Sequence, residues 1–447
     1  MKTITSQFID EIKTSATSIG IDERTEATKG IIDFVATAFA SAHNPSIQKL
    51  ITALIKEHGS GESMIVGYNE TLTASDAALV NGYILHYLDY DDVHSDLRGH
   101  ASSIILPSLL SFCQNKSFQF QHFLDSYIIG IEVAARIGRT IGSNHYESGW
   151  HSSSTIGALA ATMACAYLLD LDNDTCANAL GITITTTSGL RAQFGTDVKP
   201  LHIGLAAQKA YNAIMLSQDN TIVGNKDLLP TFYEVYSQHQ NVPSALFELN
   251  NGQLAIIQPG LWFKLYPCCS ANYHAIDATK SLLEKHSITT QNIRKINVIF
   301  PPNGDAALTF KHPTNGLEGR FSVEYVIAKL IKNRQLTIHD FSDVPIEQSI
   351  ATIMLNIERH YDGLITPSEN ALPTGRFTIV EIILNSQQKY RMRINAPKGS
   401  PNAPLSQNEL LEKLKQYAPW QARHIEDLKT IKNTEDFKLY IKPGGRK

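Results

Sequence analysis

Alanine-rich helical segments constrain the fold of this 447-residue chain most strongly. Residues 156–171 (IGALAATMACAYLLDL) and 203–217 (IGLAAQKAYNAIMLS) follow helical periodicity and are apolar nearly all round. Such segments belong at the centre of a large helical bundle, because small side chains let neighbouring helices approach closely. Helical periodicity dominates from residue 5 to roughly 265, so this stretch predicts one large all-helical domain.

The remainder of the chain has a different texture. Residues 295–300 (KINVIF), 377–384 (FTIVEIIL) and 389–394 (KYRMRI) are short, β-branched and apolar, and NSQQ separates the last two. They predict strands, with the last pair forming a hairpin. A helical pattern at residues 322–332 falls between them, so we expect a smaller α+β domain in which helices pack against a small sheet.

The chain length and one loop suggest where the two domains divide. At 447 residues the chain exceeds what a single core usually supports. The Pro- and Gly-rich residues 396–406 (APKGSPNAPLS) predict a loop before a final polar helix. We therefore expect a mainly α protein with residues 1–265 and 406–447 in the large helical domain. Residues 266–405 form the smaller α+β domain in this division.

Composition excludes several classes of function. Lys and Arg number 39 against 43 Asp and Glu, a balance that does not favour nucleic acid as a partner. The five cysteines contain no CxxC pair, so we expect neither a disulfide framework nor a zinc or iron–sulfur cage, and a reducing cytoplasm fits best. The N-terminal segment lacks the apolar core of a signal peptide, and no stretch of about twenty residues predicts a membrane span.

The densest group of ionisable residues is HYLDYDDVHSDLRGH, residues 86–100. It holds four aspartates, three histidines and Arg98, and Asp89 and Asp92 share one helix face at spacing i, i+3. A solvated helix end is the structural interpretation. A functional site is the alternative, because each buried ionisable group must be hydrated or paired.

The same segment also permits a metal interpretation. Asp91, Asp92 and Asp96 resemble the aspartate-rich magnesium site of all-helical prenyl-diphosphate enzymes. Such enzymes need a second acidic cluster on a facing helix, and none stands out downstream. The basic residues that follow suit an anionic substrate held directly by the protein, so we expect no metal.

Two further segments place ionisable residues beside buried helices. His151 in GWHSSSTIGALAA stands just before one such helix, where the helix dipole favours the neutral imidazole that a base needs. Capping of that helix is an equally good interpretation. Lys199 and His202, in TDVKPLHIGLAA, stand before another. Most lysines are exposed, but the apolar neighbours of Lys199 predict that the chain enters the core here, where the side chain could bind a carboxylate.

A fourth segment, FKLYPCCSANYHAIDA, brings Lys264, Cys269 and His274 to the proposed domain junction, where ligand clefts commonly form. Cys268 and Cys269 are too close in sequence for a comfortable disulfide. They are interpreted as small core residues, and a thiol that lines the site is the alternative.

Taken in order, HYLDYDD…GH, GWHSSSTIGALAA, TDVKPLHIGLAA, KLYPCC…H and EGRFSVEY (318–325) resemble successive blocks of the MmgE/PrpD family. The resemblance covers roughly residues 5 to 395. The family includes 2-methylcitrate dehydratase, cis-aconitate decarboxylase and iminodisuccinate epimerase. The resemblance implies a helical domain with an α+β lid, a homodimer, and neither a metal nor an organic cofactor.

The resemblance also assigns site residues. Those that match active-site positions of the family are Asp89, His100, His151 and Lys199, with Lys264 and Cys269 near the lid. Two pocket positions depart from the cis-aconitate decarboxylase pattern: Val93 stands in place of a threonine and Cys269 in place of a histidine, and the loop to His100 is one residue longer. Arg98, Tyr146 and His202 complete the expected substrate contacts.

The family reactions share one chemical need, because each places negative charge on a carbon beside a carboxylate. We expect Lys199 to pair with a substrate carboxylate, His151 and His100 to exchange the proton, and Asp89 to orient a histidine. The leading prediction is a cofactor-independent dehydratase or decarboxylase acting on a small di- or tricarboxylate such as 2-methylcitrate or cis-aconitate. An epimerase of an amino or imino dicarboxylate is the alternative, and a non-catalytic family member is the third class.

Overall fold

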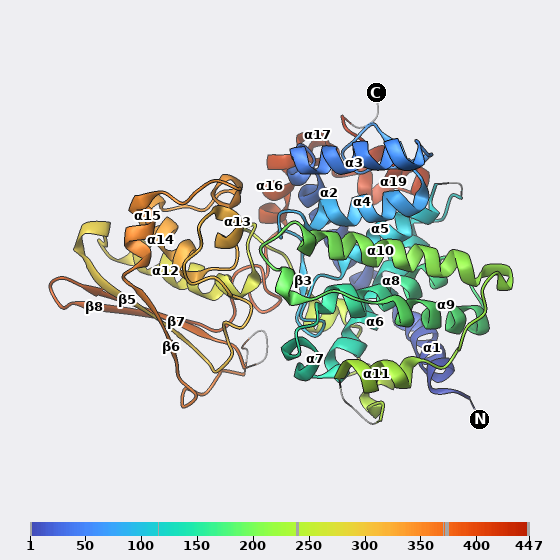
Figure 1. Ribbon diagram of the computed structural model, residues 1–447, viewed down its shortest axis with the longest axis horizontal. Coiled ribbons are helices and arrows are strands. Elements are labelled where there is room, and N and C mark those ends of the chain that lie inside the picture. Colours follow the sequence, from blue (N-terminus) through green and yellow to red (C-terminus); the bar gives the residue numbers. More distant parts are fainter. Residues whose placement is uncertain (1, 115, 238–240, 370, 372–374, 445–447) are drawn as a thin grey trace.

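The computed structural model describes residues 2–114, 116–237, 241–369, 371 and 375–444. It has a large helical part, which carries both chain ends, and a smaller part built on a sheet (Figure 1). The α-helices of the first part are α1 (Ile4–Ser15), α2 (Ile21–Ser41), α3 (Pro45–His58), α4 (Ala74–His86), α5 (Ser102–Phe112), α6 (Phe120–Ile141), α7 (Ser143–Glu147), α8 (Ser152–Leu168), α9 (Asn173–Thr186), α10 (Val198–Ser217), α11 (Leu229–Ser237), α16 (Gln407–Tyr417), α17 (Pro419–Arg423), α18 (Asp427–Thr430) and α19 (Thr434–Tyr440).

The alanine-rich helices α8 and α10 lie at the centre of the helical part, as predicted. α10 packs on α4, α8 and α5, and α8 also packs on α6. Glycines permit the closest approach: a Cβ on Gly204 of α10 would lie 2.2 Å from the Leu79 carbonyl oxygen of α4. The opposing Gly82 of α4 would meet the Gly204 Cα at 2.9 Å. Small residues therefore bring α4, whose end carries the acidic segment, directly against α10.

The smaller part is a four-stranded sheet in the order β6-β5-β7-β8, covered by helices (Figure 1). β5 (Ile293–Phe300) pairs parallel with β6 (Ile357–Tyr361) and antiparallel with β7 (Thr378–Leu384), which pairs antiparallel with β8 (Lys389–Ile394). Its helices are α12 (Tyr273–Lys285), α13 (Gly316–Gly319), α14 (Val323–Asn333) and α15 (Gln348–Met354). The expected α+β class, its hairpin and the helix at 322–332 are confirmed.

Each part has its own apolar core. The helical core runs along the chain from Phe8 to Phe263 and resumes at Leu405, while the core of the smaller part extends from Cys268 to Ile382 and also includes Val93 and Trp262. We retain 1–265 with 406–447, and 266–405, as the proposed division into a helical domain and a lid. Among the described residues, no helix is both long and apolar enough to cross a membrane.

Candidate active site

A cavity of about 560 Å³ lies between the helical domain and the lid. Its walls carry both charged and apolar side chains, as ligand sites commonly do. The residues that line it from the helical domain include Asp89, Val93, Arg98, His100, Tyr146, Glu147, His151, Arg191, Phe194 and Lys199, and those from the lid include Cys269, Asn303, Ala306, Phe321 and Arg376.

The loop after α4 carries the acidic residues to this cavity. Two of its residues, Asp89 and Arg98, have φ of 53°, in the left-handed region that non-glycine residues seldom adopt. Within the loop, β3 (Val93–His94) pairs antiparallel with β4 (Leu261–Trp262), the segment that leads into Lys264. The pairing fixes the loop against the entry to the lid. Strained backbone that the surroundings hold in place clusters at functional sites.

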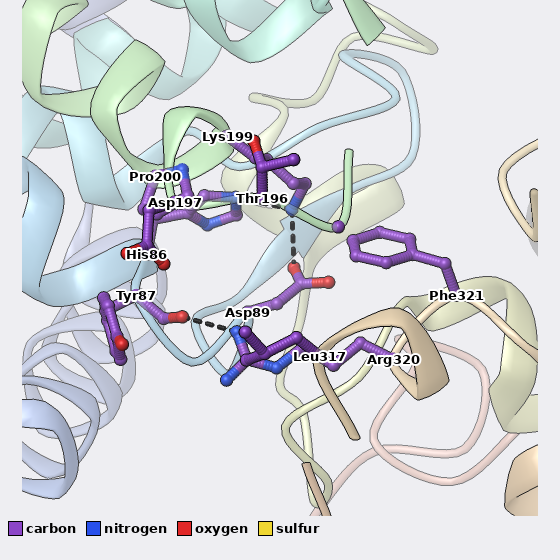
Figure 2. Close-up of a pocket in the computed structure, with 11 residues that line it drawn as sticks. His86, Tyr87, Asp89, Thr196, Asp197, Lys199, Pro200, Leu317, Arg320 and Phe321 are labelled. Carbon is purple, nitrogen blue, oxygen red and sulfur yellow. Dashed lines mark hydrogen bonds and ion pairs between the residues drawn. The ribbon is translucent and has the colours of Figure 1, made fainter. Parts of the chain in front are cut away.

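Asp89 is the centre of a buried charge cluster. Its Oδ1 lies 2.8 Å from the Lys264 Nζ, 3.1 Å from the Lys199 Nζ and 3.2 Å from the His100 Nε2. Burial alone would raise the pKa of Asp89, but the two ammonium groups and His100 hold that pKa well below its usual range. Figure 2 shows Asp89 pointing to Lys199 in a neighbouring cavity of about 20 Å³, room for a single water.

His86 supports Lys199 from behind. The Lys199 Nζ lies 2.6 Å from the His86 Nε2, and the His86 Nδ1 lies 2.9 Å from the Asp91 Oδ1. An ammonium can only donate, so Nε2 accepts and Nδ1–H donates to Asp91. Burial lowers the pKa of His86 to about 3, which agrees with this neutral tautomer. Burial and the neighbouring Lys264 also lower the pKa of Lys199, against the opposing pull of Asp89.

His100 and His151 line the same cavity, but their surroundings differ. The His100 Nδ1 lies 3.1 Å from the Asp91 Oδ2, and its Nε2 faces Asp89. Burial would lower the pKa of His100, yet the two carboxylates raise it. Burial, Lys199 and His86 hold the pKa of His151 well below its usual range. The first imidazole is therefore stabilised as a cation and the second as a neutral base.

His151 is the N-cap residue of α8, but its side chain does not cap that helix. Its Nδ1 instead lies 3.2 Å from the Nδ1 of His202, which comes from the second turn of α10. His202 is half-buried and stands behind His151, outside the set of residues that line the cavity. The prediction that His202 contacts substrate is thus not supported by its position.

Lys264 and Cys269 occupy different places in the site. Lys264 is fully buried, donates to both the Asp89 carbonyl oxygen (2.7 Å) and Oδ1, and does not line the cavity. It therefore supports Asp89 instead of facing a ligand. Cys269 does line the cavity, and burial raises the pKa of its thiol, so the neutral thiol is favoured. Its neighbour Cys268 is buried in the lid core.

The acidic cluster also has the donor set of a metal site. Ligand atoms of His86, Asp89, Asp91 and His100 all lie within 4.8 Å of one another. Lys199 and Lys264, however, already contact the Asp89 carboxylate, and Lys199 also donates to the His86 Nε2. Two ammonium groups at these positions supply the compensating positive charge and would repel a divalent cation. The described residues therefore fit a site without a metal ion better than a metal site.

The three aspartates of the magnesium interpretation do not converge. Asp91 faces His86 and His100, whereas the Asp96 Oδ2 lies 3.2 Å from Arg139. Asp92 is buried apart from the cavity, and burial raises its pKa to about 7. This arrangement does not provide clustered carboxylates for a bridging magnesium ion.

Sequence reasoning missed His86 and several lid residues. His86 opens the ionisable segment 86–100 but was given no role of its own, because a histidine at the end of an apolar helix usually belongs to the core. Arg376 and Phe321 reach the cavity from the lid, more than 200 residues along the chain from Asp89. Phe321 lies in the EGRFSVEY block that carries the family resemblance, but no local pattern marks Arg376, and only tertiary folding brings both to the site.

Comparison with known proteins identifies related sequences. The model of the MmgE/PrpD N-terminal domain matches residues 4–244, and that of the MmgE/PrpD C-terminal domain matches residues 266–434. The cis-aconitate decarboxylase of Aspergillus terreus (strain NIH 2624 / FGSC A1156) is 24% identical over 443 residues, covering 92% of this chain and 87% of that protein. The human cis-aconitate decarboxylase is 27% identical over 382 residues, covering 80% and 76%.

Proposed function

The chain belongs to the MmgE/PrpD family, and from this premise we propose that it is a cofactor-independent and metal-independent lyase. Its substrate is a small di- or tricarboxylate such as cis-aconitate or 2-methylcitrate. The relatives that are named cis-aconitate decarboxylases support the lyase class. Val93 and Cys269, which depart from the pattern of that enzyme, both line the cavity. These differences favour a substrate that is related to cis-aconitate over cis-aconitate itself.

One observation carries the proposal: Lys199, His100 and His151 line one cavity, where the surroundings raise the pKa of His100 and lower that of His151. Lys199 is the group we propose to bind the carboxylate next to the reacting carbon, where it stabilises the charge that develops there. Asp89 holds the Lys199 ammonium and keeps His100 protonated through the contacts above. Environments that push two pKa values apart assign the acid and the base. His100 is therefore the proposed acid and His151 the proposed base.

These roles serve either lyase reaction. In a decarboxylation the carbon–carbon bond breaks and CO₂ leaves. His100, as the acid, then delivers a proton to the carbon that keeps the electron pair. In a dehydration His151 removes the proton from carbon, and His100 protonates the departing hydroxide. Both routes return the histidines to their starting states by proton exchange with water. Tyr146, Arg98 and Cys269 are the proposed substrate contacts on the remaining walls.

The test is an NMR assay of the purified protein in D₂O with 2-methylcitrate, cis-aconitate and iminodisuccinate, run with and without a chelator. Release of water or CO₂ from any of them, undiminished by the chelator, is expected. Deuterium exchange without release would instead establish the epimerase. That alternative draws support from the two histidines with opposite pKa directions, since epimerisation needs one group to remove a proton and another to return it.

A non-catalytic role would be indicated if all three compounds stayed unchanged while Lys199→Ala and His151→Ala also left every binding property unchanged.

We further propose that the protein is a homodimer located in the cytoplasm. All five cysteines are free, which suits a reducing compartment. Light scattering should give twice the chain mass, and a monomer mass would reject the dimer.

A further inference from the structure

Three arginines line the cavity, and one of them is already engaged by the protein. The Arg191 Nη1 donates to the Tyr146 carbonyl oxygen at 2.7 Å, and its Nη2 donates to the Ala306 carbonyl oxygen at 2.8 Å. The same guanidinium stacks 3.7 Å above the centre of the Tyr146 ring. Arg191 thus joins the helical domain to the lid and orients Tyr146, while its Nε has no hydrogen-bond partner among the described residues.

The other two arginines are not engaged in this way. Within the part of the chain that the structure describes, the side chains of Arg98 and Arg376 make no hydrogen bond or ion pair, although both line the cavity. Arg98 belongs to the strained loop of the helical domain, and Arg376 stands just before β7 in the lid. Two like charges that share one cavity repel each other unless an anion lies between them.

Nearby acids are not available to neutralise this pair. The carboxylate of Asp305 is 2.9 Å from the Arg359 Nη1 and accepts from the Tyr361 hydroxyl at 2.9 Å. Asp89 is held by the two lysines, and Glu147 is exposed at the cavity edge without an ion pair to either arginine among the described residues. The cavity therefore has an excess of positive charge at Arg98 and Arg376.

We propose that Arg98 and Arg376 form a second carboxylate site, one guanidinium from each domain, that selects substrates carrying a carboxylate remote from the reacting carbon. This inference rests on the proposed function, in which Lys199 takes the carboxylate beside the reacting carbon. Guanidinium groups match carboxylates through paired hydrogen bonds. A ligand bound by both arginines also bridges the domains, so the remote carboxylate positions the lid over the reacting end of the substrate.

The experiment measures binding of unreactive probes, so that it is independent of the chemistry. Propane-1,2,3-tricarboxylate and glutarate carry a remote carboxylate, and butyrate is glutarate without it. Calorimetry, with NMR titration for weak binding, is applied to wild type, Arg98→Gln and Arg376→Gln. Each variant should bind the two polycarboxylates about tenfold or more weakly, with unchanged butyrate affinity. Arg376→Lys should recover part of the loss.

The matched control is Arg294→Gln, an exposed lid arginine on β5 outside the cavity, which should bind every probe as wild type does. Polycarboxylate affinity unchanged in both cavity variants would overturn the second carboxylate site while leaving the lyase intact. A wild-type protein that binds none of the probes would also overturn the second carboxylate site, whereas the lyase is tested separately by turnover in the NMR assay. If turnover is found, the cavity variants should raise KM more than they lower kcat.

Discussion

His151 is the residue whose loss should separate catalysis from folding most cleanly. Because it makes no cap bond and its contacts are to other site residues, His151→Gln should lower kcat by about 10²–10⁴-fold while the protein stays folded. Steady-state kinetics and circular dichroism on the same preparation make the measurement. His312→Gln, an exposed lid histidine, is the control, and equal activity in both variants would remove His151 from the mechanism.

The charge state of Lys199 should determine how kcat/KM depends on pH. A lysine is a cation only below its pKa, and burial lowers the pKa of Lys199. The carboxylate-binding cation is therefore lost as pH rises, at a lower pH than for an ordinary lysine. We expect kcat/KM to fall on the alkaline side below the usual lysine range. Lys199→Arg, which stays charged, should lose this alkaline limb, and an unchanged limb would assign the titration to another group.

Residue types in sequence located much of the site because polar groups that must be buried are rare. The acidic segment, His151 and Lys199 stand beside apolar helices, whereas the full set of Asp89, His100, His151 and Lys199 was assigned by the family resemblance; the structure places all four around one cavity. The orientation of Lys264 toward Asp89 and the location of His202 behind His151 could not be predicted from the sequence. They depend on side-chain directions that the packing of α8, α10 and the β3–β4 pair decides.

At the scale of elements, helix α16 holds the backbone that carries the site residues in place. The Lys413 Nζ of α16 donates to the Asp33 Oδ1 of α2 at 2.7 Å and to the carbonyl oxygens of Tyr90 and Lys264 at 2.9 and 3.1 Å. One ammonium thus holds the backbone next to Asp89 and that of Lys264 itself. It is a positioning residue, since it does not line the cavity.

Lys413→Met should leave Asp33 as an uncompensated buried group and cost about 3–5 kcal/mol of unfolding free energy. Urea unfolding measures the loss. Asp33→Asn combined with Lys413→Met should recover part of it, because both charges are then removed. Lys415→Met, in an exposed pair with Glu412, should cost less than about 1 kcal/mol. A Lys413 variant as stable as the Lys415 variant would contradict this role.

Elements were predictable where their periodicity was strong. The helices at 156–171 and 203–217 and the strands at 295–300, 377–384 and 389–394 are all present. β6 was missed because its burial alternates weakly: it is an edge strand whose Glu358 and His360 are exposed. A half-solvated edge strand lacks the apolar run that marks its neighbours.

At the scale of the whole molecule, Arg320 ties the lid to the site loop. Its Nη1 donates to the Tyr87 carbonyl oxygen at 2.6 Å (Figure 2). Its Nε and Nη2 donate to the Phe341 carbonyl oxygen. The Arg320 carbonyl oxygen in turn accepts from the Cys269 N–H. One residue therefore connects a lid core residue, the cavity wall and the turn that precedes Asp89.

Arg320→Met should loosen this junction without removing any group from the reacting end of the cavity. Misplacement of the loop is expected to lower kcat/KM by about 10–10²-fold, and limited proteolysis between the domains should become faster. Arg294→Met on the outer sheet supplies the comparison and should resemble wild type in both assays. Faster proteolysis without a kinetic effect would show that the junction holds the domains but does not position the site.

The two-domain organisation was predictable because helical periodicity dominates up to roughly residue 265 and strand patterns appear from residue 295 onward. How the domains meet was not predictable, since the contacts of Arg191, Arg320 and the β3–β4 pair involve side chains and carbonyl groups with no local signature. The cavity belongs to that interface, so its shape follows from tertiary packing.

The Asp33–Lys413 pair also sets an order of events during synthesis. The two residues are 380 positions apart, with the entire lid encoded between the helical core and α16. A ribosome that adds roughly 5–20 residues per second needs on the order of ten seconds to pass the lid. Throughout that interval the nascent helical domain carries Asp33 and the site-loop carbonyls without their cation. The contacts of Asp33 and of the site-loop carbonyls are therefore completed only after α16 has been synthesised, and we expect a translation product that stops within the lid to lack the cation that holds the site loop.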